Sequence, residues 1–183
     1  MIQLIINADD LGLHPRIDEG ILQGHRSGVV SSATVLATGR TAPAAVEKAL
    51  AQGLSLGVHL CLTTHLTPAA PASTVRWLAP GGRFRRNWSE LSMAWLGGLV
   101  PADEVGIELR AQIERARTLG VQIDHLDTHQ HLHLLPGMTT VVEGLAAELN
   151  VPVRWPQERP TSHWVRHPRS ALKTAIVGGL ARM

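Results

Sequence analysis

The chain has 183 residues, a length that fits one domain (residues 1–183) with a sizeable core. Hydrophobic residues make up 44% and charged residues 17%, which is typical of a folded globular protein and excludes a largely disordered chain. The net charge is only +2 and the arginines form no stripe, so no nucleic-acid binding is expected. No apolar stretch approaches about 18 residues and no basic leader is present, which predicts a cytoplasmic protein that does not enter the membrane.

The N-terminal stretch, residues 2–7, is an isoleucine-rich run that predicts a strand buried on both faces of a parallel sheet. Two adjacent carboxylates, Asp9 and Asp10, follow it. Such groups repel each other, and the end of a buried strand usually tolerates them only where a cation or proton chemistry uses them. The alternative is an ordinary strand-ending turn with a helix cap.

The next elements alternate between helical and extended patterns. Helices are predicted from Pro15 to about Gly28 and over residues 41–52, and strands over residues 29–37 and 54–62. The last of these strands carries His59 near its carboxyl end in an otherwise apolar run. A lone histidine there is more often a satisfied core residue than a ligand, but its place at a strand end, like that of the aspartate pair, favours a ligand.

Residues 63–88 show no periodicity and contain several prolines and glycines, which predicts a functional loop such as a lid or substrate rim. The remaining patterns predict three helices, two strands and a last helical stretch. The helices are expected over 89–99, 101–119 and 136–150, the strands over 121–129 and 151–155, and the last helix over 170–181.

The segment from His125 to His133 packs four of the ten histidines and a carboxylate into nine residues. Its ionisable residues are all odd-numbered, so an extended strand would place them on one face. They are His125, Asp127, His129, His131 and His133. Imidazole and carboxylate suit divalent first-row metals, and a carboxylate such as that of Asp127 commonly orients a ligating imidazole. The segment therefore predicts half of a metal site, with a His-rich surface strand as the alternative.

Five strands alternating with helices predict an α/β fold with a parallel sheet, either open or closed as a barrel. Both architectures place active sites at the carboxyl ends of the strands. The aspartate pair, His59, the histidine cluster and Arg154 all fall at such ends, and this convergence predicts an enzyme.

Three motifs in chain order resemble those of the YdjC-like family of carbohydrate deacetylases. They are Asn-Ala-Asp-Asp-Leu-Gly at 7–12, Gly-Val-His-Leu at 57–60 and His-Leu-Asp-Thr-His-Gln-His-Leu-His at 125–133. The resemblance covers essentially the whole chain. It implies a distorted or incomplete β/α barrel related to the polysaccharide deacetylases, and hydrolysis of an N-acetyl group on an amino sugar or chito-oligosaccharide.

The same resemblance implies roles for individual residues. Asp10, His59 and His129 would hold one divalent metal ion, Mg²⁺ or Zn²⁺, and Asp9 would be the general base. Asp127 is expected behind a ligating histidine, and the residues expected to contact the acetylated amino-sugar substrate are His131, His133 and Arg154. The resemblance also leaves a homodimer open.

Two other functions share this ligand set. One is another metal-dependent hydrolase such as a phosphoesterase, and the other is a catalytically weak sugar-binding or regulatory protein. The five predicted strands also fall short of the roughly eight of a closed β/α barrel, so we expect the fold to be truncated at its C-terminal end.

Overall fold

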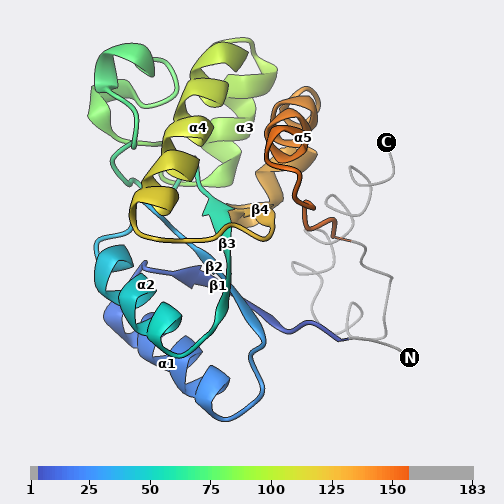
Figure 1. Ribbon diagram of the computed structural model, residues 1–183. Coiled ribbons are helices and arrows are strands. Elements are labelled where there is room, and N and C mark those ends of the chain that lie inside the picture. Colours follow the sequence, from blue (N-terminus) through green and yellow to red (C-terminus); the bar gives the residue numbers. More distant parts are fainter. Residues whose placement is uncertain (1–3, 157–183) are drawn as a thin grey trace, which may run out of the picture.

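The computed structural model describes residues 4–156, in which strands and helices alternate along the chain (Figure 1). The strands are β1 (Asn7–Leu11), β2 (Ser32–Val35), β3 (Ser55–Leu60) and β4 (Leu126–Thr128). The α-helices are α1 (Pro15–Arg26), α2 (Ala42–Ala51), α3 (Trp88–Leu96), α4 (Ala102–Thr118) and α5 (Met138–Leu149). Three short 3-10 helices complete the set: η1 (Ala72–Thr74), η2 (Pro80–Gly82) and η3 (His129–Leu134).

The four strands form one parallel sheet in the order β1-β2-β3-β4. Beyond β4, the predicted fifth strand is reduced to a single bridge between Leu126 and Val153. Leu126 donates its N–H to the carbonyl of Pro152 and accepts one from Arg154, each at 2.9 Å. The expected α/β fold with parallel strands is confirmed, and within residues 4–156 the four strands form one open sheet.

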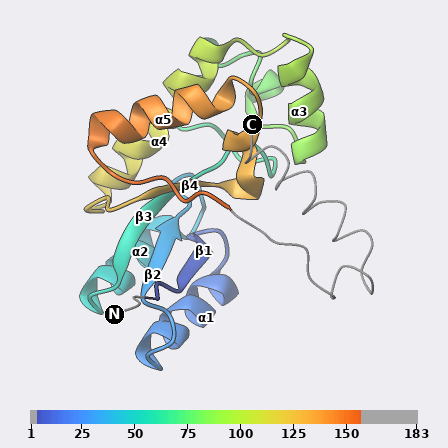
Figure 2. The ribbon, with the colours of Figure 1, turned by 90° about the vertical axis from the view of Figure 1, so that its right-hand side faces the viewer.

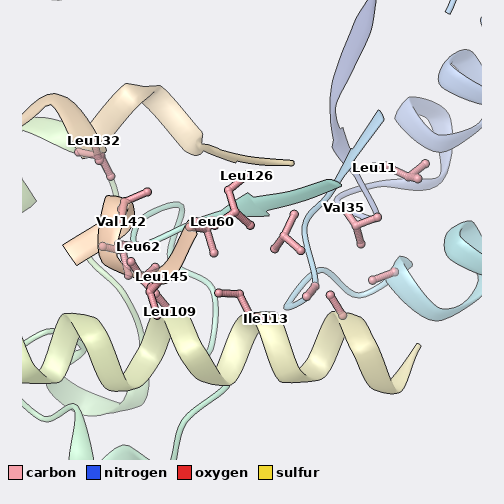
Figure 3. Close-up of a cluster of buried hydrophobic side chains, with 14 of the residues drawn as sticks. Leu11, Val35, Leu60, Leu62, Leu109, Ile113, Leu126, Leu132, Val142 and Leu145 are labelled. Atoms are coloured by element: carbon pink, nitrogen blue, oxygen red, sulfur yellow. The ribbon is translucent and has the colours of Figure 1, made fainter. Parts of the chain in front are cut away.

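Figure 2 shows two groups of helices, α1 and α2 beside the start of the sheet and α3, α4 and α5 beyond β3 and β4. The second group builds the core that Figure 3 displays, in which Leu109 and Ile113 lie one turn apart on α4. They face Leu60 and Leu126 of the sheet, and Val142 joins from α5. This packing holds the carboxyl ends of β3 and β4 on a rigid base.

The first strand does not lie where the apolar run predicted it. Leu4 and Ile5 are 79% and 74% exposed, and they line an open cavity of about 740 Å³ at the amino ends of the strands. Pairing starts at Ile6, whose carbonyl accepts the N–H groups of Ser31 and Ser32. Over the described residues 4–6 the predicted strand was wrong, because a strand begins where a partner strand is available, which hydropathy alone does not reveal. Residues 2 and 3 lie outside the described part of the chain.

A stripe of polar side chains on α4 fixes the loop of residues 63–88. Glu104 accepts the two backbone N–H groups of residues 77–78, and Glu108 accepts those of residues 69–70, all at 2.9 Å. One turn further, Gln112 bonds both the N–H and the carbonyl of residue 61. All three side chains are buried, and the two glutamates attach the loop to α4 at two places.

None of the helices within residues 4–156 is long and apolar enough to cross a membrane. The helix predicted over residues 170–181 lies outside the described residues.

Candidate metal centre

A bulge in β1 places two neighbouring carboxylates at the same edge of the sheet. Between the paired positions at either end of the bulge, Asp9 and Asp10 lie opposite the single residue Thr34 of β2. Asp10 adopts the left-handed conformation, with φ of 66°. Two successive residues of a regular strand would point to opposite faces, so the bulge is what lets both carboxylates reach one site.

Three side chains converge from the ends of three strands. Oδ1 of Asp10 lies 3.0 Å from Nδ1 of His129 and 3.3 Å from Nε2 of His59, and the two imidazole nitrogens lie 3.1 Å apart. Their ligand atoms all fall within 4.8 Å of one another. One carboxylate oxygen and two imidazole nitrogens form a donor set that fits a divalent ion and leaves further coordination positions open.

Asp127 lies behind His59, on the neighbouring strand β4. Its Oδ1 is 2.6 Å from Nδ1 of His59, and both residues are buried. A carboxylate there holds the proton on Nδ1 and turns the Nε2 lone pair toward Asp10 and His129. The sequence predicted a carboxylate in this position, and the structure shows which histidine it contacts.

The charges of these groups are strongly coupled. Burial alone would lower the pKa of His59, but the carboxylates of Asp10 and Asp127 outweigh it and raise that pKa to about 9. Burial likewise opposes ionisation of Asp10, yet hydrogen bonds from His129 and His59 hold its pKa far below the usual range. The pKa of Asp127 is also lowered, against its burial, chiefly by His59. A protonated His59 thus lies between two carboxylates, in a place where a metal cation could replace the proton.

Asp9, the other carboxylate of the bulge, pairs with Arg154. Nη1 of Arg154 lies 2.7 and 3.0 Å from the two oxygens of Asp9 and 3.4 Å from Oδ2 of Asp127. Asp9, His59 and Asp127 also form a group whose ligand atoms could surround an ion. Since the guanidinium already contacts two of those carboxylates, the group of Asp10 with the two histidines is the better candidate metal site.

The histidine cluster does not form the extended strand that the alternation predicted. β4 ends at Thr128, and the chain turns at once into η3, with Gln130 and His131 at positive φ of 59° and 56°. The alternation therefore stops after His129. The prediction that all five odd-numbered side chains share one face was wrong, because nothing in the local sequence marks two left-handed residues that are not glycine.

The other histidines of the cluster do not belong to the group of three candidate ligands. His133 is 1% exposed, its Nδ1 is 2.5 Å from the hydroxyl of Thr128, and its ring contacts Trp155. Burial lowers its pKa to about 4, which keeps the ring neutral. His131 lies edge-on to His133, with ring centroids 6.3 Å apart. Substrate contacts by these two residues remain predictions, and for His133 they would require a local rearrangement.

His125 faces the opposite, amino end of the sheet. It bonds the adjacent carboxylate of Asp124, and its ring packs so closely on Gly57 that a Cβ there would come within 2.5 Å of it. Its part in the cluster is structural.

Two residues of the site escaped the sequence analysis. Thr34, fully buried in β2, lies 3.2 Å from Oδ2 of Asp127. Asn7 donates to Asp9 at 2.9 Å and to Thr34 at 3.3 Å. A hydroxyl in β2 and an amide at the start of β1 were the available signals, but threonine is common in strands and gave no reason to single it out.

The chain is similar in sequence to curated proteins over most of its length. The chain is 40% identical over 158 residues to a carbohydrate deacetylase of Brevibacillus brevis, covering 85% of this chain and 60% of the relative. It is 34% identical over 181 residues to a mouse protein of the same name, covering 96% of this chain and 58% of the relative. The chain thus spans about 60% of the length of these curated relatives.

A solved structure from Enterococcus faecalis, provisionally named a cellobiose-phosphate cleavage protein, superimposes with a TM-score of 0.76 at 30% identity. The match covers 91% of this chain and 64% of that one. The family model described as YdjC-like protein matches residues 3–182, nearly the whole sequence. The chain therefore belongs to the YdjC-like protein family.

Proposed function

We propose that this chain is a metal-dependent carbohydrate deacetylase, which removes an N-acetyl group from an amino sugar or chito-oligosaccharide. The observation that carries the proposal is the convergence of Asp10, His59 and His129 from three strand ends, with Asp9 beside them. The names of the relatives supply the substrate class, because they are called carbohydrate deacetylases.

The residues divide the work of amide hydrolysis between them. A divalent ion held by Asp10, His59 and His129 would lower the pKa of a water molecule and polarise the acetyl carbonyl. Asp9, adjacent to this set, accepts the proton of the attacking water. Attack at the carbonyl carbon and cleavage of the C–N bond release acetate, and the departing amine takes up the proton that Asp9 accepted from the water.

The contact between Arg154 and Asp9 serves this mechanism by orientation. Two hydrogen bonds from one guanidinium nitrogen fix the direction of the Asp9 oxygens, and Asn7 holds Oδ1 from the other side. The Asp9 side chain is thus held in one orientation, so it loses little conformational entropy when it accepts a proton from the water.

The same contact also favours a second candidate, a metal-dependent sugar-binding protein with weak turnover. Both oxygens of Asp9 already contact Arg154, so they reach a water molecule only if the guanidinium moves. Release of acetate from acetylated chito-oligosaccharides, measured with and without a chelator, separates the two candidates. Metal-dependent sugar binding without acetate release would identify the second.

The ligand set is tested by elemental analysis of the purified chain and of two histidine variants. We expect about one equivalent of Zn²⁺ or Mg²⁺ in the unmodified chain and none in His129→Ala, because only two ligands remain. The exposed His65, on the loop after β3, provides the matched control, and His65→Ala should keep the ion. If His129→Ala kept its full metal content while His131→Ala or His133→Ala lost it, the assignment would be wrong.

A further inference from the structure

Thr34 lies between Asp127, which contacts His59, and Asn7, which contacts Asp9. Its side chain is fully buried in β2, opposite the β1 bulge. The hydroxyl is 3.2 Å from Oδ2 of Asp127, 3.3 Å from Nδ2 of Asn7 and 3.4 Å from Nδ1 of His59. The hydroxyl therefore contacts Asp127, which orients the proposed ligand His59, and Asn7, which donates a hydrogen bond to Asp9.

The chemistry of the partners fixes the direction of each hydrogen bond. An ionised carboxylate only accepts and an amide nitrogen only donates, so the hydroxyl proton goes to Asp127 and a lone pair takes the N–H of Asn7. The reverse orientation of the Asn7 amide would turn its oxygen toward the carboxylate of Asp9, which is repulsive. Nδ1 of His59 gives its proton to Oδ1 of Asp127 at 2.6 Å, the much shorter contact.

Oδ2 of Asp127 has a second donor within reach. Nη1 of Arg154 lies 3.4 Å from it, while the same nitrogen holds Asp9 at 2.7 Å. Without the threonine hydroxyl, the Asp127 carboxylate would rotate toward the guanidinium. That rotation takes Oδ1 out of line with His59 and draws Arg154 away from Asp9.

We propose that Thr34 is a positioning residue, whose hydroxyl holds Asp127 in the orientation that presents His59 to the metal. The inference rests on the proposed function, because it assumes that His59 is a ligand. It adds a requirement on β2, a strand that supplies no ligand itself.

The test is Zn²⁺ affinity, measured by competition with a chromophoric chelator, in one variant that lacks the Thr34 hydroxyl and one that keeps it. Thr34→Val keeps the branched shape, and Thr34→Ser keeps the hydroxyl. Loss of a partner behind a ligand typically weakens binding 10- to 100-fold, so we expect roughly a tenfold loss in Thr34→Val and near-normal affinity in Thr34→Ser. Thr38→Val is the matched control, since the Thr38 hydroxyl has no hydrogen-bond partner within residues 4–156.

Each outcome is decisive. Equal affinity in Thr34→Val and the unmodified chain would overturn the inference, and so would equal weakening in Thr34→Val and Thr34→Ser, since packing would then be the cause. If Thr34→Val does not fold, as judged by circular dichroism, Thr34→Ala against Thr34→Ser replaces it, because these two differ only by the hydroxyl. An unmodified chain that binds no Zn²⁺ or Mg²⁺ would refute the proposed function instead, and the positioning role would fall with it.

Discussion

Two groups of carboxylates in this molecule have different kinds of partner and serve different ends. At the strand ends, Asp10 and Asp127 face the imidazoles of His59 and His129. On α4, Glu104 and Glu108 face backbone N–H groups of the loop. The burial is similar for Asp127 and the glutamates, but the partners differ in kind.

That difference in partners decides what each region can do. Imidazole partners lower the pKa of both aspartates and can themselves lose a proton, so a metal ion can replace that proton. Backbone N–H groups cannot titrate, and burial of Glu108 raises its pKa despite them. The strand ends are therefore suited to binding, while the carboxylates on α4 only hold the loop in place.

The largest expected effect comes from removing the proposed base. Asp9→Asn keeps the size and the contact to Arg154 but cannot accept a proton, so turnover should fall by about 10² to 10⁴. Metal content should not change, because Asp9 is outside the ligand set. Steady-state deacetylation and elemental analysis measure the two quantities, and near-normal turnover in Asp9→Asn would remove this residue from the role.

Asp127→Asn tests the carboxylate behind the ligand. An amide at this position holds Nδ1 of His59 less strongly, so Zn²⁺ affinity should fall about 10- to 100-fold while the chain stays folded. Unchanged affinity by chelator competition would show that the contact at 2.6 Å does not orient His59.

The pH dependence of metal affinity follows from the pKa of His59. That pKa is raised to about 9, so in the metal-free chain the ring is protonated below that pH and binding must release the proton. Apparent Zn²⁺ affinity should rise about tenfold per pH unit between pH 6 and 8, the slope expected for one released proton. A flat profile would mean that His59 is already neutral or is not a ligand.

The smallest effect is expected on α4, and it should appear in stability alone. Glu108→Gln turns one acceptor into a donor that faces a backbone N–H, which should lower the free energy of unfolding by about 1 kcal/mol. Zn²⁺ affinity should be unchanged. Denaturant unfolding compared with Glu143→Gln, a change at an exposed position of α5, is the measurement. An equal loss in both variants would show that the bonds of Glu108 add nothing.

Local signals in the sequence predicted much of the fold. Pro15 at its first turn marked the start of α1, and Gly120 just beyond the last turn of α4 marked its end, because both residues restrict or permit backbone angles locally. The convergence of Asp10, His59 and His129 could also be predicted from the sequence, since each follows or ends a predicted parallel strand and the carboxyl ends of such strands share one edge of the sheet.

Features that depend on contacts between distant residues could not be predicted in this way. The sequence suggested Arg154 for substrate binding, yet the structure places it on Asp9, which is 145 residues away. The roles of Thr34 and Gln112 likewise appear only once their partners on other elements are in place. Sequence periodicity shows which residues share a face of one helix or strand. It does not show which residues of other elements contact that face.

The bulge in β1 has a consequence for how this chain tolerates insertions and deletions. Two residues of β1 lie opposite one of β2, so deleting either aspartate would restore a regular ladder between Ala8 and Leu11. The shortened strand would pair at least as well, and the sheet would lose nothing in hydrogen bonding. The remaining aspartate could serve as ligand or as base, but not as both. A single-codon deletion at this position should therefore yield a folded chain whose two chemical roles can no longer coexist.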